Sequence, residues 1–182
     1  SLPMNYSTPE LLRHWLNLHM KYIIKLMKTT ILIIYIISLS FSNLVIAKVI
    51  NGKPKIIDGD TIHIKNYKIR LHGIDAPETN QKCIFNDKEW ECGKFSTQYL
   101  KKITLKKFVE CKIQGIDRYK RFIGTCFVNK KNLNQLMVKD GWAIAYRYYS
   151  KKYIDEEFIA KKNKKGIWRG DFEEPYLYRK KN

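Results

Sequence analysis

The chain has 182 residues, of which 45% are hydrophobic and 13% aromatic, so one domain with a hydrophobic core is expected and a disordered chain is not. Its 35 Lys and Arg against 17 Asp and Glu give a formal net charge of +18 and a sequence pI near 9.7. This surplus indicates a polyanionic partner, most simply nucleic acid, with an anionic membrane surface as the alternative.

Residues 1–26 admit two interpretations. The segment Ser7-Thr8-Pro9-Glu10 precedes apolar residues at helical spacing and predicts the start of a short amphipathic helix. The alternative, which we favour, is upstream sequence translated ahead of a start at Met20 or Met27.

Residues 27–47 have the pattern of a secretory signal peptide. A positive flank at Lys28 is followed by an apolar run over residues 31–41, and Val45-Ile46-Ala47 ends the segment in residues suited to cleavage. The apolar stretch is short for a membrane span and is interrupted by Ser and Asn, which disfavours the alternative of a permanent anchor. Cleavage after Ala47 removes a net three of the 18 positive charges and leaves +15.

The domain itself is expected to span residues 48–182 and to begin with strand segments at 49–50 and 56–57. The segment Asp58-Gly59-Asp60 then predicts a turn, because Gly59 can take the positive φ that a Cβ would resist.

A hairpin is expected next. Apolar and polar residues alternate over 61–65 and 68–72, on either side of a short Asn66-Tyr67 link. A hairpin of that length returns the chain to its start, so Asp75 should lie near Asp60.

Carboxylates gather around this hairpin. Pro77 lacks an N–H, so it should end the strand and leave Glu78 on a rigid loop beside Asp60 and Asp75. Three converging carboxylates are costly unless a cation lies between them, and an all-oxygen set suits a hard ion such as Ca²⁺ or Mg²⁺. The alternative of ordinary turn acids accounts poorly for the whole set with Arg70 on the same strand.

Three helices are expected further along the chain. Residues 93–107 place apolar side chains at helical spacing, and this face should pack against the sheet. Residues 132–140 predict a short helix with one apolar face, and residues 155–165 predict a last helix that carries Phe158 and Ile159. Gly141 should cap the second helix. The tail over 169–182 is expected to be a solvated basic end.

Residues 108–128 predict a second hairpin. Its tip, residues 117–120, presents Arg118 and Tyr119 next to Arg121, a cationic cluster with an aromatic among it. Taken alone, a solvated hairpin end accounts for this composition.

The four cysteines lack the short spacing of a zinc site and predict disulfides. Of three possible pairings we predict Cys83 with Cys92, which closes a local loop, and Cys111 with Cys126, which occupy facing hairpin positions within disulfide reach. An even cysteine count and a signal peptide together indicate an oxidising compartment, so we expect an exported protein, periplasmic or secreted.

Three motifs carry a resemblance to a known family. Ile57-Asp58-Gly59-Asp60-Thr61, followed by Arg70-Leu71 and Asp75-Ala76-Pro77-Glu78-Thr79, resembles the staphylococcal-nuclease-like (thermonuclease) family over roughly residues 48–170. The order and spacing of the motifs together make the resemblance specific. It implies an α+β, mainly β fold: a five-stranded antiparallel OB-type barrel flanked by three helices.

The resemblance also implies a Ca²⁺-dependent nuclease that hydrolyses DNA and RNA and leaves 3′-phosphates. Asp60, Asp75 and the backbone carbonyl of Ala76, where the family often has Thr, would hold the Ca²⁺, which would neutralise and polarise the phosphate. Glu78 would orient or deprotonate the attacking water.

The family's arginines have counterparts here. Arg70 and Arg121 would donate bidentate hydrogen bonds to the phosphate as charge builds in the transition state. Lys120 replaces the usual glycine of the family's second arginine motif, and Lys tolerates positive φ poorly. Asp58 would support the metal ligands. The expected substrate-binding residues are Arg118, Tyr119, Tyr146 and Tyr148, with core packing as the alternative for the last two.

A non-catalytic OB-fold module that only holds nucleic acid is the competing function. Such a module has no need for Asp60, Asp75 and Glu78 together, so we expect an SNase-like endonuclease. A protein held at a membrane by its uncleaved apolar segment is a third interpretation. We expect a monomer, with nucleic acid as substrate and no stable membrane association after cleavage.

Overall fold

The computed structural model describes residues 8–40 and 48–181, and the chain divides into two units, Ser1–Ile46 and Ala47–Asn182. In the first unit, one continuous helix, α1 (Thr8–Ser40), replaces the short helix expected before residue 26. The expected cleavage site at residues 45–47 lies outside the described residues. Among the helices in the described ranges, none has both the length and the apolar content needed to cross a membrane.

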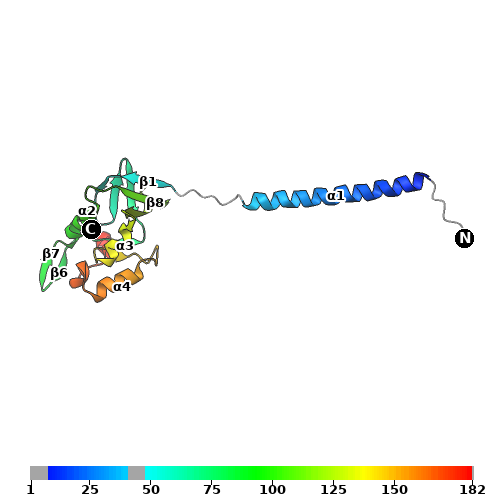
Figure 1. Ribbon diagram of the computed structural model, residues 1–182. Coiled ribbons are helices and arrows are strands. Elements are labelled where there is room, and N and C mark those ends of the chain that lie inside the picture. The colour runs from blue at the N-terminus through cyan, green and yellow to red at the C-terminus, as the bar shows by residue number, and fades with distance from the viewer. Residues whose placement is uncertain (1–7, 41–47, 182) are drawn as a thin grey trace. The chain divides into compact units, whose positions relative to one another are not determined.

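Within the described residues of the second unit, a seven-stranded sheet forms the framework (Figure 1). Its strands are β1 (Val49–Gly52), β2 (Pro54–Ile56), β3 (Thr61–Ile64), β4 (Tyr67–Leu71), β8 (Val109–Ile116), β9 (Phe122–Val128) and β10 (Lys131–Asn132). The strand order is β1-β8-β9-β4-β3-β2, with β10 on β9. Only Lys53 separates β1 from β2 in the chain, although they stand at opposite ends of this order. The sheet must therefore curl back on itself into a nearly closed barrel.

Both expected hairpins are present, and the α+β, OB-type fold class is confirmed. Strand β3 pairs with β4 in antiparallel orientation, and so does β8 with β9. One contact differs from the all-antiparallel expectation, because β4 and β9 pair in parallel with Arg70 opposite Ile123. These strands belong to separate hairpins that meet side by side, so each hairpin stays antiparallel while the contact between them does not.

Each hairpin turn contains a lysine with a positive φ. Ile64 pairs with Tyr67, so the first link is Lys65-Asn66 and lies one residue earlier than predicted. Lys65 takes a φ of 54° there, and Lys120 takes a φ of 61° at the tip of the second hairpin. Each lysine thus adopts the left-handed conformation that a glycine would adopt more readily.

Helices flank the barrel: α2 (Cys92–Thr104), α3 (Leu133–Lys139), α4 (Ile154–Lys162), the 3₁₀ helix η1 (Gly166–Arg169) and α5 (Pro175–Lys181). The first three correspond to the expected helices. Gly141 ends α3 as predicted, with a φ of 76° and its N–H donating to the Val138 carbonyl. Half of the tail that was expected to be a solvated basic end forms the helix α5, in which Pro175 is buried and Tyr176 and Leu177 are 40% and 45% exposed.

The core fills the barrel and continues beneath the helices. The alternating apolar residues of β3 and β4 all point inward and are fully buried against residues of β8 and α3. These residues are Ile62, Ile64, Ile69, Leu71, Val109, Leu133 and Met137.

Two small sheets lie outside the barrel: β5 (Ile74–Asp75) with β11 (Ile144–Ala145), and β6 (Cys83–Phe85) with β7 (Lys88–Trp90). The β6–β7 hairpin projects from the body at the end away from β1 (Figure 1). Both expected disulfides are present: Cys83–Cys92 ties this hairpin to α2, and Cys111–Cys126 joins β8 to β9.

Candidate active site

Backbone pairing brings the ends of β3 and β4 to one place. The Leu71 N–H donates to the Asp60 carbonyl at 2.8 Å, which extends the hairpin by one bond beyond β3. The chain then turns through Gly73 into β5, so Asp75 returns beside Asp60 as expected. Both side chains are buried, at 3% and 0% exposure. We define the acidic cluster as Asp58, Asp60, Asp75 and Glu78.

Arg70 joins two members of the acidic cluster. Its Nη2 lies 2.7 Å from Asp75 Oδ1 and 3.0 Å from Asp60 Oδ2. Asp60 also accepts hydrogen bonds from the Thr61 hydroxyl at 2.9 Å and the Ala76 N–H at 3.3 Å. Burial alone would lower the pKa of Arg70, but the charges of Asp60 and Asp75 outweigh it and the pKa is raised. Arg70 is therefore a permanent cation between two carboxylates.

Asp75 keeps an unusual pKa despite its arginine partners. Burial and the charge of Asp60 raise the pKa of Asp75 to about 6, against the lowering influence of Arg179 and Arg70. Two buried carboxylates this close repel one another, and the arginines offset only part of that cost. The arginines therefore neutralise only part of the negative charge at this site.

Asp58 completes the turn that precedes Asp60. Its Oδ1 accepts the Asp60 N–H at 2.9 Å. The positive φ expected for Gly59 is not found. A Cβ at Gly59 would instead lie 2.1 Å from Ser96 Oγ and 2.6 Å from Ala76 Cβ, so the glycine serves close packing between the turn and α2.

Glu78 lies on the loop after Pro77, as expected, and its carboxylate meets a residue that we did not predict. Arg179 of α5 places Nη1 2.9 Å from Glu78 Oε1 and Nη2 2.9 Å from Asp75 Oδ1. The available signal was Pro175, since proline favours the first position of a helix, and a helix starting there carries Arg179 in its second turn.

Arg121 lies at the tip of the β8–β9 hairpin in a separate group. Its Nε donates to Asp117 Oδ2 at 2.8 Å, and its guanidinium carbon lies 5.5 Å from the centre of the Tyr119 ring. Arg118 contacts the same ring, at 4.9 Å. Across the described part of the chain, no hydrogen bond or ion pair joins Arg121 to the acidic cluster. Asp117 is a further residue that sequence reasoning gave no role.

Tyr146 and Tyr148 belong to an aromatic group that borders the acidic cluster. The Tyr146 ring lies 6.3 Å from Tyr148, 5.2 Å from Tyr149 and 6.4 Å from Tyr176 of α5. Burial, and then the charge of Asp75, raise the pKa of Tyr146, which places this hydroxyl within the field of the cluster. Tyr148 is 82% exposed, so core packing does not explain it.

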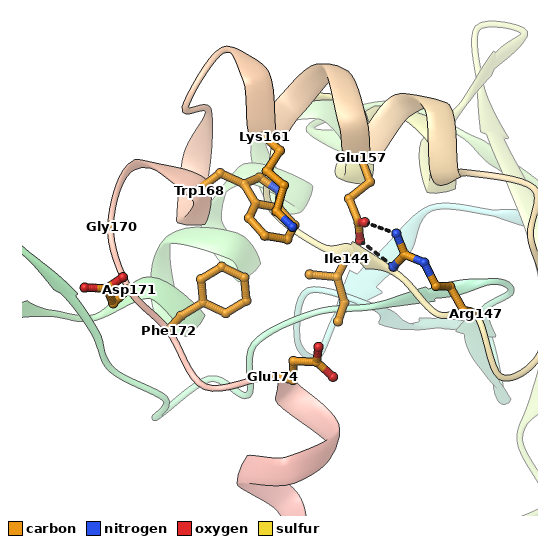
Figure 2. Close-up of a pocket in the computed structure, with 9 residues that line it drawn as sticks. All are labelled: Ile144, Arg147, Glu157, Lys161, Trp168, Gly170, Asp171, Phe172 and Glu174. Carbon is orange, nitrogen blue, oxygen red and sulfur yellow. Dashed lines mark hydrogen bonds and ion pairs between the residues drawn. The ribbon is translucent and has the colours of Figure 1, made fainter.

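A cavity with a volume of about 630 Å³ is lined by none of the predicted site residues. Figure 2 shows the side chains that line it. Its walls are Ile144, Arg147, Glu157, Lys161, Trp168, Gly170, Asp171, Phe172 and Glu174. Arg147 points toward Glu157 of α4, with which it forms an ion pair. Buried Glu157 also accepts the Ala145 N–H at 2.8 Å. Glu157 therefore holds the chain at Ala145 and Arg147, on either side of Tyr146.

The donor set of the acidic cluster suits a hard cation. In residues 8–40 and 48–181, no three His, Cys, Asp or Glu side chains are arranged to hold a metal as they stand. The carboxylate oxygens of the acidic cluster instead contact Arg70 and Arg179. Asp60 and Asp75 nevertheless share one nitrogen of Arg70, so they lie close enough for a cation with Ca–O distances of about 2.3–2.6 Å to contact both.

Residues 68–170 match the family model described as staphylococcal nuclease homologue. The succinoglycan biosynthesis protein ExoI of Rhizobium meliloti is 36% identical over 127 residues, which cover 68% of this chain and 66% of that protein. Micrococcal nuclease of Shigella flexneri is 30% identical over 144 residues, 69% of this chain and 78% of the relative. An uncharacterized endonuclease of Escherichia coli O157:H7 is 32% identical over 148 residues, which cover 76% of this chain and 91% of that protein.

The curled barrel, its buried carboxylates and the arginines among them form the fold and candidate site of an SNase-like domain. The matched domain and the similarity to a micrococcal nuclease show that the chain belongs to the staphylococcal nuclease family. It spans just under two thirds of the length of the ExoI protein, at 66%.

Proposed function

We propose that this chain is an exported, Ca²⁺-dependent phosphodiesterase that hydrolyses DNA and RNA and leaves 3′-phosphates. The observation that carries the proposal is the meeting of Asp60 and Asp75 around Arg70, with Glu78 beside them. The net charge of +18 supports a polyanionic substrate. Two disulfides support an oxidising compartment, periplasmic or extracellular.

Asp60 and Asp75 would hold the Ca²⁺, with the backbone carbonyl of Ala76 as a further oxygen ligand. When bound, the ion would neutralise a phosphate and polarise it toward attack. The Ala76 N–H already fixes Asp60, at 3.3 Å from Oδ2, and Asp58 fixes the Asp60 backbone. The protein thus orients its ligand oxygens through neighbouring backbone groups.

Glu78 would act as the general base. As the oxygen of water forms a bond to phosphorus, the carboxylate takes the water's proton. The bond from phosphorus to the 5′-oxygen breaks, and that oxygen takes a proton from solvent and leaves as a 5′-hydroxyl, while Glu78 returns its proton to solvent. The phosphate stays on the 3′-oxygen of the other product.

Arg70 and Arg121 would stabilise the charge that builds on the phosphate. Asp117 takes only the Nε of Arg121, which leaves the outer N–H groups of this guanidinium for a phosphate. Tyr119 and Tyr148 are exposed by 64% and 82% and offer ring faces for bases to stack on, with Tyr146 behind Tyr148. Arg118, which lies against the Tyr119 ring, would contact the sugar–phosphate backbone of the nucleic acid.

The test of activity is degradation of single- and double-stranded DNA and RNA with Ca²⁺, Mg²⁺ or a chelator. We expect cleavage with Ca²⁺, none with chelator, and 3′-phosphate ends on the products. The chain should act as a monomer, without stable membrane association once residues 1–47 are removed.

The test of mechanism is the kinetics of Arg70→Lys and Glu78→Gln on single-stranded DNA. Each should lower kcat by about 100-fold or more while substrate affinity changes little, because both groups act on the transition state. An ammonium cannot reproduce the two-pronged contact of Arg70, so lysine should not rescue. Near-normal kcat in both variants would refute the catalytic assignment and favour a module that only binds nucleic acid.

A further inference from the structure

We propose that Arg179, on the C-terminal helix α5, is a positioning residue of the catalytic centre that holds Glu78 and Asp75 in a fixed relation. This inference rests on the proposed nuclease activity. One guanidinium spans both carboxylates, with Nη1 2.9 Å from Glu78 Oε1 and Nη2 2.9 Å from Asp75 Oδ1. More than 100 residues separate the partners in the chain, so only the fold brings them together.

Arg179 extends the pairing begun by Arg70. Asp75 Oδ1 contacts both guanidinium groups, at 2.7 Å from Arg70 and 2.9 Å from Arg179. Acids and arginines therefore alternate along one row: Asp60, Arg70, Asp75, Arg179 and Glu78. Arg179 ends this row on the residue proposed to take the proton from water, at the position that has to be held most accurately.

The segment that carries Arg179 is attached to the Glu78 loop by a second, buried contact. The fully buried Gln81 accepts the Glu78 N–H at its Oε1, at 3.2 Å, and its Nε2 donates to the Glu173 carbonyl at 2.7 Å. Just before, Asp171 and Ile84 exchange two backbone hydrogen bonds of 2.8 Å. The start of α5 is thus fixed to the same loop whose carboxylate its second turn contacts.

The role belongs to one side chain and not to the basic tail in general. Lys180 lies over the Tyr176 ring at 4.7 Å, and Lys181 pairs with Glu173. Within residues 8–40 and 48–181, no hydrogen bond or ion pair joins Lys180 or Lys181 to the acidic cluster. A guanidinium presents its two Nη groups in a fixed planar fork, one to each carboxylate, and the single point charge of a lysine on its flexible stem cannot reproduce this geometry.

The experiment compares Arg179→Ala and Arg179→Lys with Lys180→Ala, a matched control that removes the same charge from the next residue. The wild type is assayed first on single-stranded DNA with Ca²⁺. We expect Arg179→Ala to lower kcat about 10- to 100-fold with little change in KM, Arg179→Lys to behave similarly, and Lys180→Ala to match the wild type. Added guanidinium ion should restore part of the kcat of Arg179→Ala and none in Arg179→Lys.

Two further measurements separate positioning from damage to the fold. Thermal unfolding should show all three variants folded. Direct titration with Ca²⁺ should show binding to Arg179→Ala at least as tight as to the wild type, because a cation next to Asp75 has been removed. Weaker Ca²⁺ binding would mean that the cluster had collapsed, and would overturn the inference.

The outcomes against the inference are distinct from failure of the proposed function. An active wild type with kcat unchanged or raised in Arg179→Ala, or lowered equally in Lys180→Ala, overturns the role of Arg179 alone. A raised kcat would show that Arg179 blocks the site. A wild type without turnover on any nucleic acid refutes the proposed nuclease, and the role of Arg179 falls with it.

Discussion

Asp58 is the member of the acidic cluster without an arginine partner among the described residues. Its Oδ1 accepts one backbone N–H, from Asp60, whereas Asp60, Asp75 and Glu78 each contact a guanidinium. Burial, and then the charges of Asp60 and Glu78, raise the pKa of Asp58 to about 7. Its charged form is therefore the least stabilised in the cluster.

This pKa predicts a pH-dependent effect of Asp58→Asn on stability. The unfolded chain loses this proton near pH 3.8 and the folded chain near pH 7, so the stability associated with Asp58 is present below pH 4 and lost by about pH 7. Asparagine keeps the Oδ1 acceptor and carries no charge. With chelator present, we expect the variant to gain about 1–3 kcal/mol in free energy of unfolding at pH 8 and almost none at pH 4, measured in urea. An equal gain at both pH values would show that charge is not the cause.

Residues that act within one hairpin could be predicted from the sequence. The alternation of apolar and polar residues predicted the inward face of the β3–β4 hairpin. The length of this hairpin predicted that Asp75 lies next to Asp60, as it does. Arg179 could not be found in this way, since its contacts depend on how the last helix packs and its neighbours have the composition of a solvated tail. Gly59 was assigned to a turn for the wrong reason, because crowding by Ser96 becomes visible only once α2 is packed.

At the scale of elements, the start of α2 supports the Glu78 loop. The Gly93 N–H donates to the Gln81 carbonyl at 3.1 Å. A Cβ on Gly93 would lie 1.6 Å from the carbonyl oxygen of Glu78, which is backbone and cannot move aside alone. The helix can approach the loop this closely only with a glycine at this position.

We therefore expect Gly93→Ala to displace the Glu78 loop. It should lower kcat at least about 10-fold and destabilise the domain by about 1–3 kcal/mol, because helix and loop have to separate. The matched control is Gly115→Ala in β8, where no atom lies within 4 Å of the added Cβ and φ is not positive. Kinetics and urea unfolding of both variants test this expectation, and equal effects at the two sites would contradict it.

Elements with strong internal periodicity could be predicted, and those created by packing could not. The hairpins β3–β4 and β8–β9 and the helices α2 and α3 each carry their own apolar face, whereas Phe158 and Ile159 of α4 are 65% and 42% exposed. The parallel contact of β4 with β9 has no local signal, because it depends on how two hairpins meet. The β6–β7 hairpin also lacks a local signal, since its short strands leave Ile84 and Phe85 exposed and have no alternating pattern.

At the scale of the whole molecule, the site lies within one unit of the chain. The boundary between the two units falls between Ile46 and Ala47, next to the expected cleavage after Ala47. All residues of the acidic cluster, both disulfides and Arg179 lie in the second unit. Residues 1–47 contribute a net charge of only +3 of the total +18, so the second unit keeps the basic character that attracts a polyanion.

The last prediction is that residues 48–182 suffice for the proposed nuclease activity without residues 1–47. Expressed alone in an oxidising compartment, this segment should show a kcat/KM within about two-fold of the chain that carries residues 1–47, because no group of the site is lost. Mass spectrometry of exported protein should find Lys48 at the mature N-terminus. The matched control is 53–182, which lacks β1 and with it one end of the strand order, so it should lose stability and activity together. Exported protein that retains residues 31–47, or a 48–182 segment that folds without activity, would contradict this division of the chain.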